Sequence, residues 1–382
     1  MHRYFMVFGL ACCFLLPVAC GGGGETNLTG GSNSAGSGGS NAGGGNAGGN
    51  DAGGGNAGGG NTGGGGAGGG GNTGGGGSGG APMAVYDPNL DGPYMIAEMD
   101  DSAFKVAETG DTVPIHVSYP TNGPTAGPYP VVVVAHGFQL PATQYYGYLK
   151  RLASHGYVAL TTDYPTSLQG TDNTEATKNI LAGLDWVAGK PEVKGDVNLA
   201  GMTGHSLGGK LAVYAAKLDA RVKATIVLDP VDGATGNPFN PNPMCNLPAC
   251  VDASAQLPIP KPTAFLGELT DSMSGGFQPA CAPAAENYQT FYEKTTAPSL
   301  EVTVNGANHM SFLDNVSSCG FVCSACKMAS LDNKVVNDLS RAYVVAFYER
   351  HLRGNAGYDT YLTGAEAKAR YVDKGLVTLK SK

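Results

Sequence analysis

The sequence predicts an α/β fold with a mostly parallel central sheet and helices on both faces. Short, continuous apolar runs alternate with segments whose apolar residues recur at helical spacing. Prolines and glycines bound these runs, as Pro130 and Gly137 do around 131–135. Strands that are apolar along their whole length are buried on both faces, which is typical of parallel sheets covered by helices.

The predicted elements follow one another in a regular order. Residues 94–99 and 114–119 are expected to form antiparallel edge strands. The later predicted strands are 131–135, 157–162, 197–203, 224–228, 263–266 and 300–304. The predicted helices are 144–154, 173–188, 207–218, 288–292 and 335–352. Right-handed crossovers then bring the carboxyl ends of the parallel strands, and any site they carry, to one edge of the sheet.

Residues 1–20 are expected to be an export signal. Arg3 precedes an apolar run over 4–18, and the small residue Ala19 precedes Cys20. The segment 16–20 resembles a bacterial lipoprotein signal, which would make Cys20 the acylated first residue and attach the protein to a membrane. Ordinary secretion after cleavage near Ala19 is the alternative. Both predict a location outside the cytoplasm: the bacterial cell surface or periplasm for a lipid-anchored protein, or the medium for a secreted one.

Residues 21–81 are predicted to be a disordered linker rich in glycine and asparagine. Of the 61 glycines in the chain, 34 lie within 21–80, where no aromatic residue occurs. Such a segment buries too little apolar surface to offset the entropy of ordering it. Residues 82–382 are therefore expected to form one domain. No stretch after residue 20 is long and apolar enough to span a bilayer.

The formal net charge of −8 argues against a nucleic-acid partner, which would need a basic surface. We expect a monomer. Six cysteines follow residue 20: Cys245, Cys250, Cys281, Cys319, Cys323 and Cys326. An even number in an exported chain predicts up to three disulfides, whose pairing remains open. A zinc site at the last three cysteines is disfavoured because no fourth ligand stands at zinc-site spacing. We expect neither a metal nor a cofactor.

A serine nucleophile is predicted at the junction of the strand 197–203 and the helix 207–218. The residues Gly204-His205-Ser206-Leu207-Gly208 match G-x-S-x-G in the strand–turn–helix context that this motif requires. Small residues two positions before and after the serine let the strand and the helix approach each other. Ser206 is the expected nucleophile.

The base and the acid are expected on neighbouring loops at the same edge. His309 follows the strand 300–304 and is the predicted general base, because a serine hydroxyl needs one near neutral pH. Asp229 follows the strand 224–228, and Asp271 follows the strand 263–266. Either can orient the imidazole, and spacing alone does not choose between them. Asp232 and Glu268 are expected to be solvated loop charges.

Two backbone amides are the predicted oxyanion donors. The first is the amide of Leu207, directly after the nucleophile. The second is the amide of Phe138, in the loop after the strand 131–135.

At these positions the sequence resembles the chlorophyllase family of α/β-hydrolases. The resemblance rests on six segments: 129–138, 153–157, 204–210, 229–233, 281–292 and 309–314. It implies an α/β-hydrolase fold and a serine esterase that cleaves carboxylic esters through an acyl-enzyme, with Asp229 as the triad acid. Platelet-activating-factor acetylhydrolases are similar in placing the acid after this strand. Chlorophyllases usually have an arginine where Leu207 stands.

Two other interpretations remain open at this point. Bacterial cutinases and polyester hydrolases are also similar, and that likeness would assign the acid to Asp271. A surface binding module without catalysis is the alternative from a different class. For either enzyme the expected partner is a small-molecule or lipid-like ester.

Overall fold

The computed structural model describes residues 83–233, 249–275 and 278–382. The expected export signal with Cys20, the linker, and Cys245 lie outside the described residues. Within the described part of the chain, no helix combines the length and the apolar character needed to cross a membrane.

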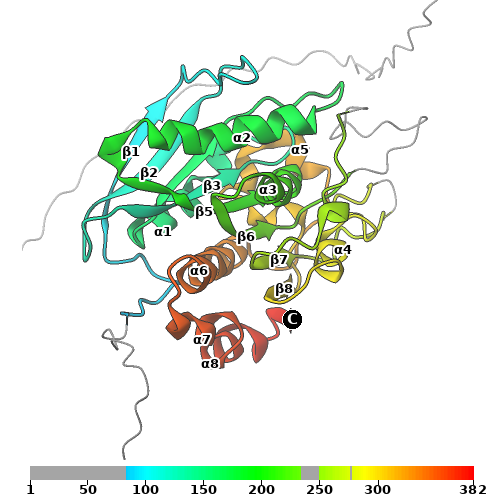
Figure 1. Ribbon diagram of the computed structural model, residues 1–382. Coiled ribbons are helices and arrows are strands. Elements are labelled where there is room, and N and C mark those ends of the chain that lie inside the picture. Colours follow the sequence, from blue (N-terminus) through cyan, green and yellow to red (C-terminus); the bar gives the residue numbers. More distant parts are fainter. Residues whose placement is uncertain (1–82, 234–248, 276–277) are drawn as a thin grey trace, which may run out of the picture. The chain divides into compact units, whose positions relative to one another are not determined.

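One nine-stranded sheet runs through the described residues (Figure 1). Its strands are β1 (Met95–Asp101), β2 (Ile115–Asn122), β3 (Tyr129–Ala135), β4 (Val158–Thr162), β5 (Gly195–His205), β6 (Val222–Leu228), β7 (Thr263–Gly267), β8 (Ser299–Val304) and β9 (Val377–Ser381). The strand order is β1-β2-β4-β3-β5-β6-β7-β8-β9. β1, β2 and β9 pair antiparallel, whereas β4, β3 and β5 to β8 are parallel.

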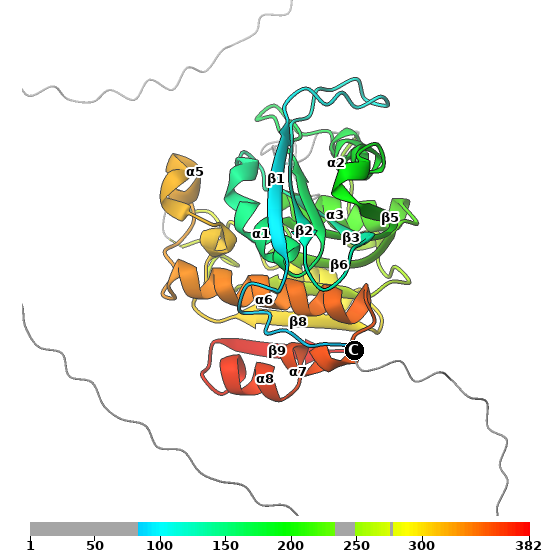
Figure 2. The ribbon, with the colours of Figure 1, turned by 90° about the vertical axis from the view of Figure 1, so that its left-hand side faces the viewer.

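Helices connect the strands. They are α1 (Tyr146–Ser154), α2 (Asn173–Ala188), α3 (Leu207–Leu218), α4 (Tyr288–Glu293), α5 (Gly320–Ser324), α6 (Asn333–His351), α7 (Asp359–Leu362) and α8 (Ala365–Ala367). Figure 2 shows α2 and α3 on the opposite side of the sheet from α1.

The apolar core consists of two clusters, one on each face of the sheet. Val131 and Val133 of β3 belong to the cluster that includes residues of α2, α3 and α4. Val132 and Val134 belong to the other cluster, with residues of α1 and α6. Successive side chains of a strand point to opposite faces, so burial of both faces requires the continuous apolar run that the sequence shows.

The predicted fold class is confirmed: the sheet is mostly parallel, and helices cover both of its faces. The bounds of α2 and α3 coincide with the predicted ranges. β9 and the short helices α5, α7 and α8 were not predicted. The predicted helix 144–154 is divided, because its first turn is a 3₁₀ turn over Ala142–Tyr145.

Disulfides join cysteines of the loops after β7 and β8. Cys281 pairs with Cys326, and Cys319 pairs with Cys323. Cys250 is also disulfide-bonded. The first pair connects the loop after β7 to the segment after α5, next to the strand ends that carry the predicted site.

Candidate active site

Ser206 occupies the sharp turn between β5 and α3. Its backbone has φ 56° and ψ −122°, a conformation that a residue with a side chain rarely adopts. The turn depends on two glycines. A Cβ at Gly204 would lie 2.3 Å from the carbonyl oxygen of Gly208, and one at Gly208 would lie 2.3 Å from that of Ala135. The spacing in the motif thus has a steric cause, and it presents the hydroxyl at the carboxyl edge of the sheet.

His309 meets the hydroxyl from the loop after β8. Its Nε2 lies 2.9 Å from Oγ of Ser206, and its Nδ1 lies 2.6 Å from Oδ2 of Asp229. All three residues are buried, with Ser206 and His309 only 5% and 3% exposed. The imidazole therefore bridges the hydroxyl and a carboxylate, which is the arrangement needed to move a proton off the serine.

Asp229 stands directly at the end of β6. Its backbone has φ 41°, and its N–H donates to the carbonyl of Leu266 on β7 at 2.6 Å. Burial raises the pKa of the Asp229 carboxyl, and the hydrogen bond from His309 acts in the opposite direction. A carboxylate in this position stabilises the imidazolium that forms when His309 accepts a proton.

Asp271, the other eligible acid, also contacts His309, but not its ring. Oδ2 of Asp271 accepts from the backbone N–H of His309 at 2.9 Å, and Oδ1 accepts from the backbone N–H of Lys327 at 2.8 Å. The side chain is fully buried. The structure thus brings Asp229 to the imidazole, whereas Asp271 holds the main chain of the loops that follow β8.

Glu268 and Asp232 are buried, so the expectation that they are solvated is wrong. Glu268 has no exposed surface, and its carboxylate accepts from the backbone N–H of Asp271 at 2.9 Å. Burial, together with the nearby charge of Asp229, raises the pKa of Glu268 to about 9. Asp232 accepts the N–H groups of Ala253 and Ser254, both at 2.9 Å. Backbone donors from loops compensate for the water that each carboxylate has lost.

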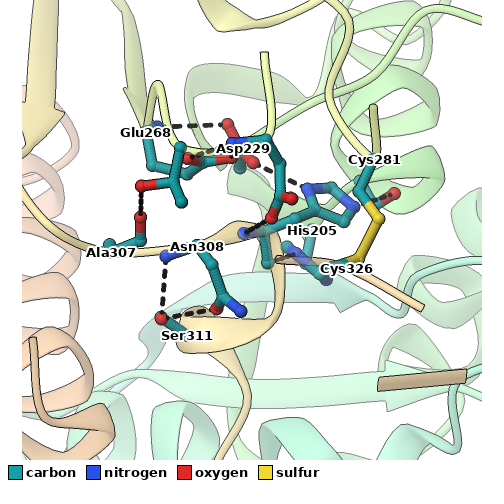
Figure 3. A network of polar contacts seen from close by, with 12 residues as sticks. His205, Asp229, Glu268, Cys281, Ala307, Asn308, Ser311 and Cys326 are labelled. Atoms are coloured by element: carbon teal, nitrogen blue, oxygen red, sulfur yellow. Dashed lines mark hydrogen bonds and ion pairs between the residues drawn. A yellow bond between two sulfur atoms is a disulfide. The ribbon is translucent and has the colours of Figure 1, made fainter. Parts of the chain in front are cut away.

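Further hydrogen bonds fix the loop that carries His309, and the sequence analysis did not foresee them. The hydroxyl of Thr270 donates to the carbonyl of Ala307 at 2.5 Å. Asn308 and Ser311 hydrogen-bond to each other in a capping box at the start of the 3₁₀ turn His309–Phe312 (Figure 3). The spacing Asn308-x-x-Ser311 is the signal for this cap in the sequence.

The two predicted oxyanion amides face no protein acceptor within the described residues. Leu207 is the first residue of α3, so its N–H has no partner inside the helix. Phe138 follows Gly137, and the next residue, Gln139, has φ 54° and donates its backbone N–H to the hydroxyl of Thr166 at 3.2 Å.

One group among the described residues has the composition of a metal site: Asp271, Cys281 and Cys326. The two sulfur atoms are joined in a disulfide, however, and metals bind thiolates. The other two cysteines of the zinc alternative, Cys319 and Cys323, are likewise paired with each other.

A cavity of about 680 Å³ lies beside the loop of His309. Its lining includes Asn308 and Met310, the neighbours of His309 in the chain, together with the apolar side chains of Val316, Met328 and Leu331. An apolar ester group could be accommodated in a space of this size.

The fold and the strained turn at Ser206 define the class of protein: this chain is an α/β-hydrolase. A family model described as chlorophyllase matches residues 91–368. The chain therefore belongs to the chlorophyllase family.

Individual relatives agree with this assignment. The chain is 29% identical to Chlorophyllase-1 of Arabidopsis thaliana over 262 residues, which cover 64% of this chain and 78% of the relative. It is 26% identical to Chlorophyllase-2 of the same plant over 202 residues, 50% of this chain and 62% of the relative. It is also 34% identical to the bis(hydroxyethyl) terephthalate hydrolase of Streptomyces coelicolor over 143 residues, 37% of this chain and 44% of the relative. These matches support a carboxylic ester hydrolase.

Proposed function

We propose that this ester hydrolase works through an acyl-enzyme, with Ser206 as nucleophile, His309 as general base and Asp229 as the acid that orients the imidazole. The observation that supports this proposal most directly is the unbroken hydrogen-bonded chain from the hydroxyl through the imidazole to the carboxylate. A positioned base of this kind contributes about 10²–10⁴ in rate.

The reaction proceeds in two halves. Oγ of Ser206 forms a bond to the ester carbonyl carbon while its proton passes to Nε2 of His309, and the amides of Phe138 and Leu207 bind the resulting oxyanion. The carbon–oxygen bond to the alcohol then breaks, and the alcohol leaves with the proton from Nε2. A water molecule, deprotonated by His309, attacks the acyl-enzyme, and the proton returns to Oγ of Ser206 as the carboxylic acid departs.

The substrate we propose is a small, uncharged or lipid-like ester. The apolar side chains in part of the lining of the cavity beside the loop of His309 favour such a group, and so does Leu207, where an arginine is usual in chlorophyllases. An aromatic diester is the second candidate, because one relative is named for bis(hydroxyethyl) terephthalate.

Turnover of p-nitrophenyl esters across acyl chain lengths tests the class of reaction and the depth of the pocket. Ser206→Ala should lower kcat by at least about 10³-fold. Ser340→Ala, at a fully buried serine of α6 outside the site, is the matched control and should retain activity. Parallel assays on bis(hydroxyethyl) terephthalate and on polyester films separate the two substrate candidates.

Labelling by a fluorophosphonate decides between an enzyme and a binding module, since only an activated serine reacts rapidly. Rapid labelling of the wild type that is absent in Ser206→Ala is the expected result. A wild-type protein that neither labels nor turns over any of these esters would contradict the proposal.

We also propose that the protein is exported and that Cys20 carries a lipid. The support is the order of a charged start, a short apolar run and Ala19-Cys20 in the sequence. Metabolic labelling with palmitate should mark the wild type and not Cys20→Ser. An unlabelled wild type found in the medium would favour ordinary secretion instead.

A further inference from the structure

A chain of buried hydrogen bonds runs beneath Ser206 and joins two other segments of the site. The backbone N–H of Gly137 donates to Oη of Tyr145 at 3.1 Å. The same oxygen lies 2.9 Å from Nδ1 of His205, and Nε2 of His205 lies 2.8 Å from the carbonyl oxygen of His309. The side chains of Tyr145 and His205 have no exposed surface. Figure 3 shows His205 within the polar network around Asp229.

The direction of every bond in this chain is determined. A carbonyl oxygen only accepts, so Nε2 of His205 must carry the hydrogen that it shares with His309. Burial lowers the pKa of His205 well below its usual value, and the ring is therefore neutral with a bare Nδ1. Tyr145 must then donate to Nδ1, which it can do because burial raises the pKa of its phenol well above the usual value. Its oxygen remains free to accept the N–H of Gly137.

The chain connects the three segments on which the reaction depends. Gly137 precedes Phe138, whose amide is a proposed oxyanion donor, and His205 precedes Ser206. The carbonyl at the far end belongs to His309 itself. The loop that contains Gly137 packs closely against these two side chains, since a Cβ at Gly137 would lie 3.2 Å from Nδ1 of His205 and 3.3 Å from Oη of Tyr145.

We propose that Tyr145 and His205 are positioning residues. They hold the loop of Gly137 and Phe138, and the backbone of His309, in fixed positions relative to Ser206. This inference rests on the proposed function. Neither side chain is expected to touch the substrate, because both are fully buried below the turn. They fix the positions of the two proposed oxyanion amides and of the imidazole of His309 before the reaction begins. This lowers the activation barrier without strengthening substrate binding.

Tyr145→Phe tests this role, because it removes one oxygen and breaks two bonds of the chain. We expect kcat on a p-nitrophenyl ester to fall by about 10–100-fold, less than the loss of an oxyanion donor itself, with KM changed by no more than about 2-fold. Tyr348→Phe is the matched control. Tyr348 is also fully buried, and its hydroxyl bonds to Oγ1 of Thr203 at 2.7 Å, within the core and away from the loops of the site. It should lose similar thermal stability and keep its kcat.

His205→Gln provides a second variant should Tyr145→Phe not fold. A glutamine amide can replace the donor at Nε2 but offers no acceptor at the position of Nδ1, so it breaks the same link to Tyr145. The two single variants should lose kcat to a similar degree, and the double variant should lose little more than either, because both belong to one unit.

The outcome that overturns the inference is a kcat of Tyr145→Phe and His205→Gln equal to that of Tyr348→Phe. Fully additive losses in the double variant would overturn it as well. Failure of the proposed function looks different: Ser206→Ala would then keep the activity of the wild type, whatever the variants of Tyr145 and His205 do.

Discussion

The loops after β6 and after β7 present the same chemical group to the same histidine and do different things with it. Both follow neighbouring parallel strands, and each carries a fully buried aspartate. Asp229, after β6, bonds to the ring of His309 at 2.6 Å, whereas Asp271, after β7, bonds to its backbone N–H at 2.9 Å. The role of a carboxylate here depends on which atom of His309 it reaches, not on the strand that it follows.

The geometry of each loop explains the difference. Asp229 is the first residue after β6, and its backbone is fixed by a bond to Leu266 on the adjacent strand. Its side chain therefore projects at the edge of the sheet, where the imidazole lies. Asp271 comes four residues after the end of β7 and also binds the N–H of Lys327 at 2.8 Å, so it joins two loops below the ring.

The largest effect that would test this contrast is expected from Asp229→Asn. The substitution preserves shape but removes the charge that stabilises the imidazolium, and an asparagine can hold the ring in the wrong tautomer. We expect kcat to fall by about 10³–10⁴-fold, with KM and the melting temperature little changed. Steady-state kinetics on a p-nitrophenyl ester, with circular dichroism as a check on folding, measures this.

Asp271→Asn is expected to lower stability more, and turnover less, than Asp229→Asn does. One of its two oxygen acceptors becomes an amide that faces a backbone N–H, which leaves a buried donor unsatisfied at a cost of about 1–3 kcal/mol. The melting temperature should fall by roughly 2–6 °C. kcat should fall by only about tenfold, since Asp229 still orients the ring and only the placement of the loop is disturbed.

The two Asn variants together show which aspartate acts as the triad acid. A larger loss of turnover in Asp271→Asn than in Asp229→Asn would assign the acid to the loop after β7. Near wild-type turnover in both would mean that neither aspartate acts as the triad acid.

The order of strands and helices could be predicted because burial on both faces leaves a pattern in the sequence. The run 131–135 is apolar throughout, since its two faces enter different clusters. β9 (Val377–Ser381) escaped prediction for the same reason: it is an edge strand, most of it is exposed, and its residues form no apolar run.

That Ser206 and His309 meet at one edge of the sheet could be predicted because the strained turn and the chain order both constrain sequence. The acid could not be chosen from spacing, because Asp229 and Asp271 both follow parallel strands at the same edge. Family resemblance favoured Asp229. The burial of Glu268 and Asp232 was missed because the backbone donors that replace their water come from turns and loops, which carry no residue-type signal.

Glu268 gives the smallest of the expected effects on turnover, and it distinguishes the two loops by the pH dependence of stability. The loop after β7 holds a carboxyl group whose pKa is raised to about 9 by burial and by the charge of Asp229 on the neighbouring loop. In the unfolded chain this group titrates near 4.5. Between these two pH values the folded protein keeps a proton that the unfolded chain has released, so Glu268 makes stability fall as the pH rises through this window.

The side chain in Glu268→Gln cannot ionise, so the stability of this variant should not fall with pH for this reason. The melting temperature of the variant relative to the wild type should rise steadily from pH 5 to pH 9, because a difference of one bound proton changes stability by up to about 1.4 kcal/mol per pH unit. Glu192→Gln, at an exposed position before β5, is the control and should show no such trend. A difference between Glu268→Gln and the wild type that stays constant over this range would mean that Glu268 is ionised near neutral pH.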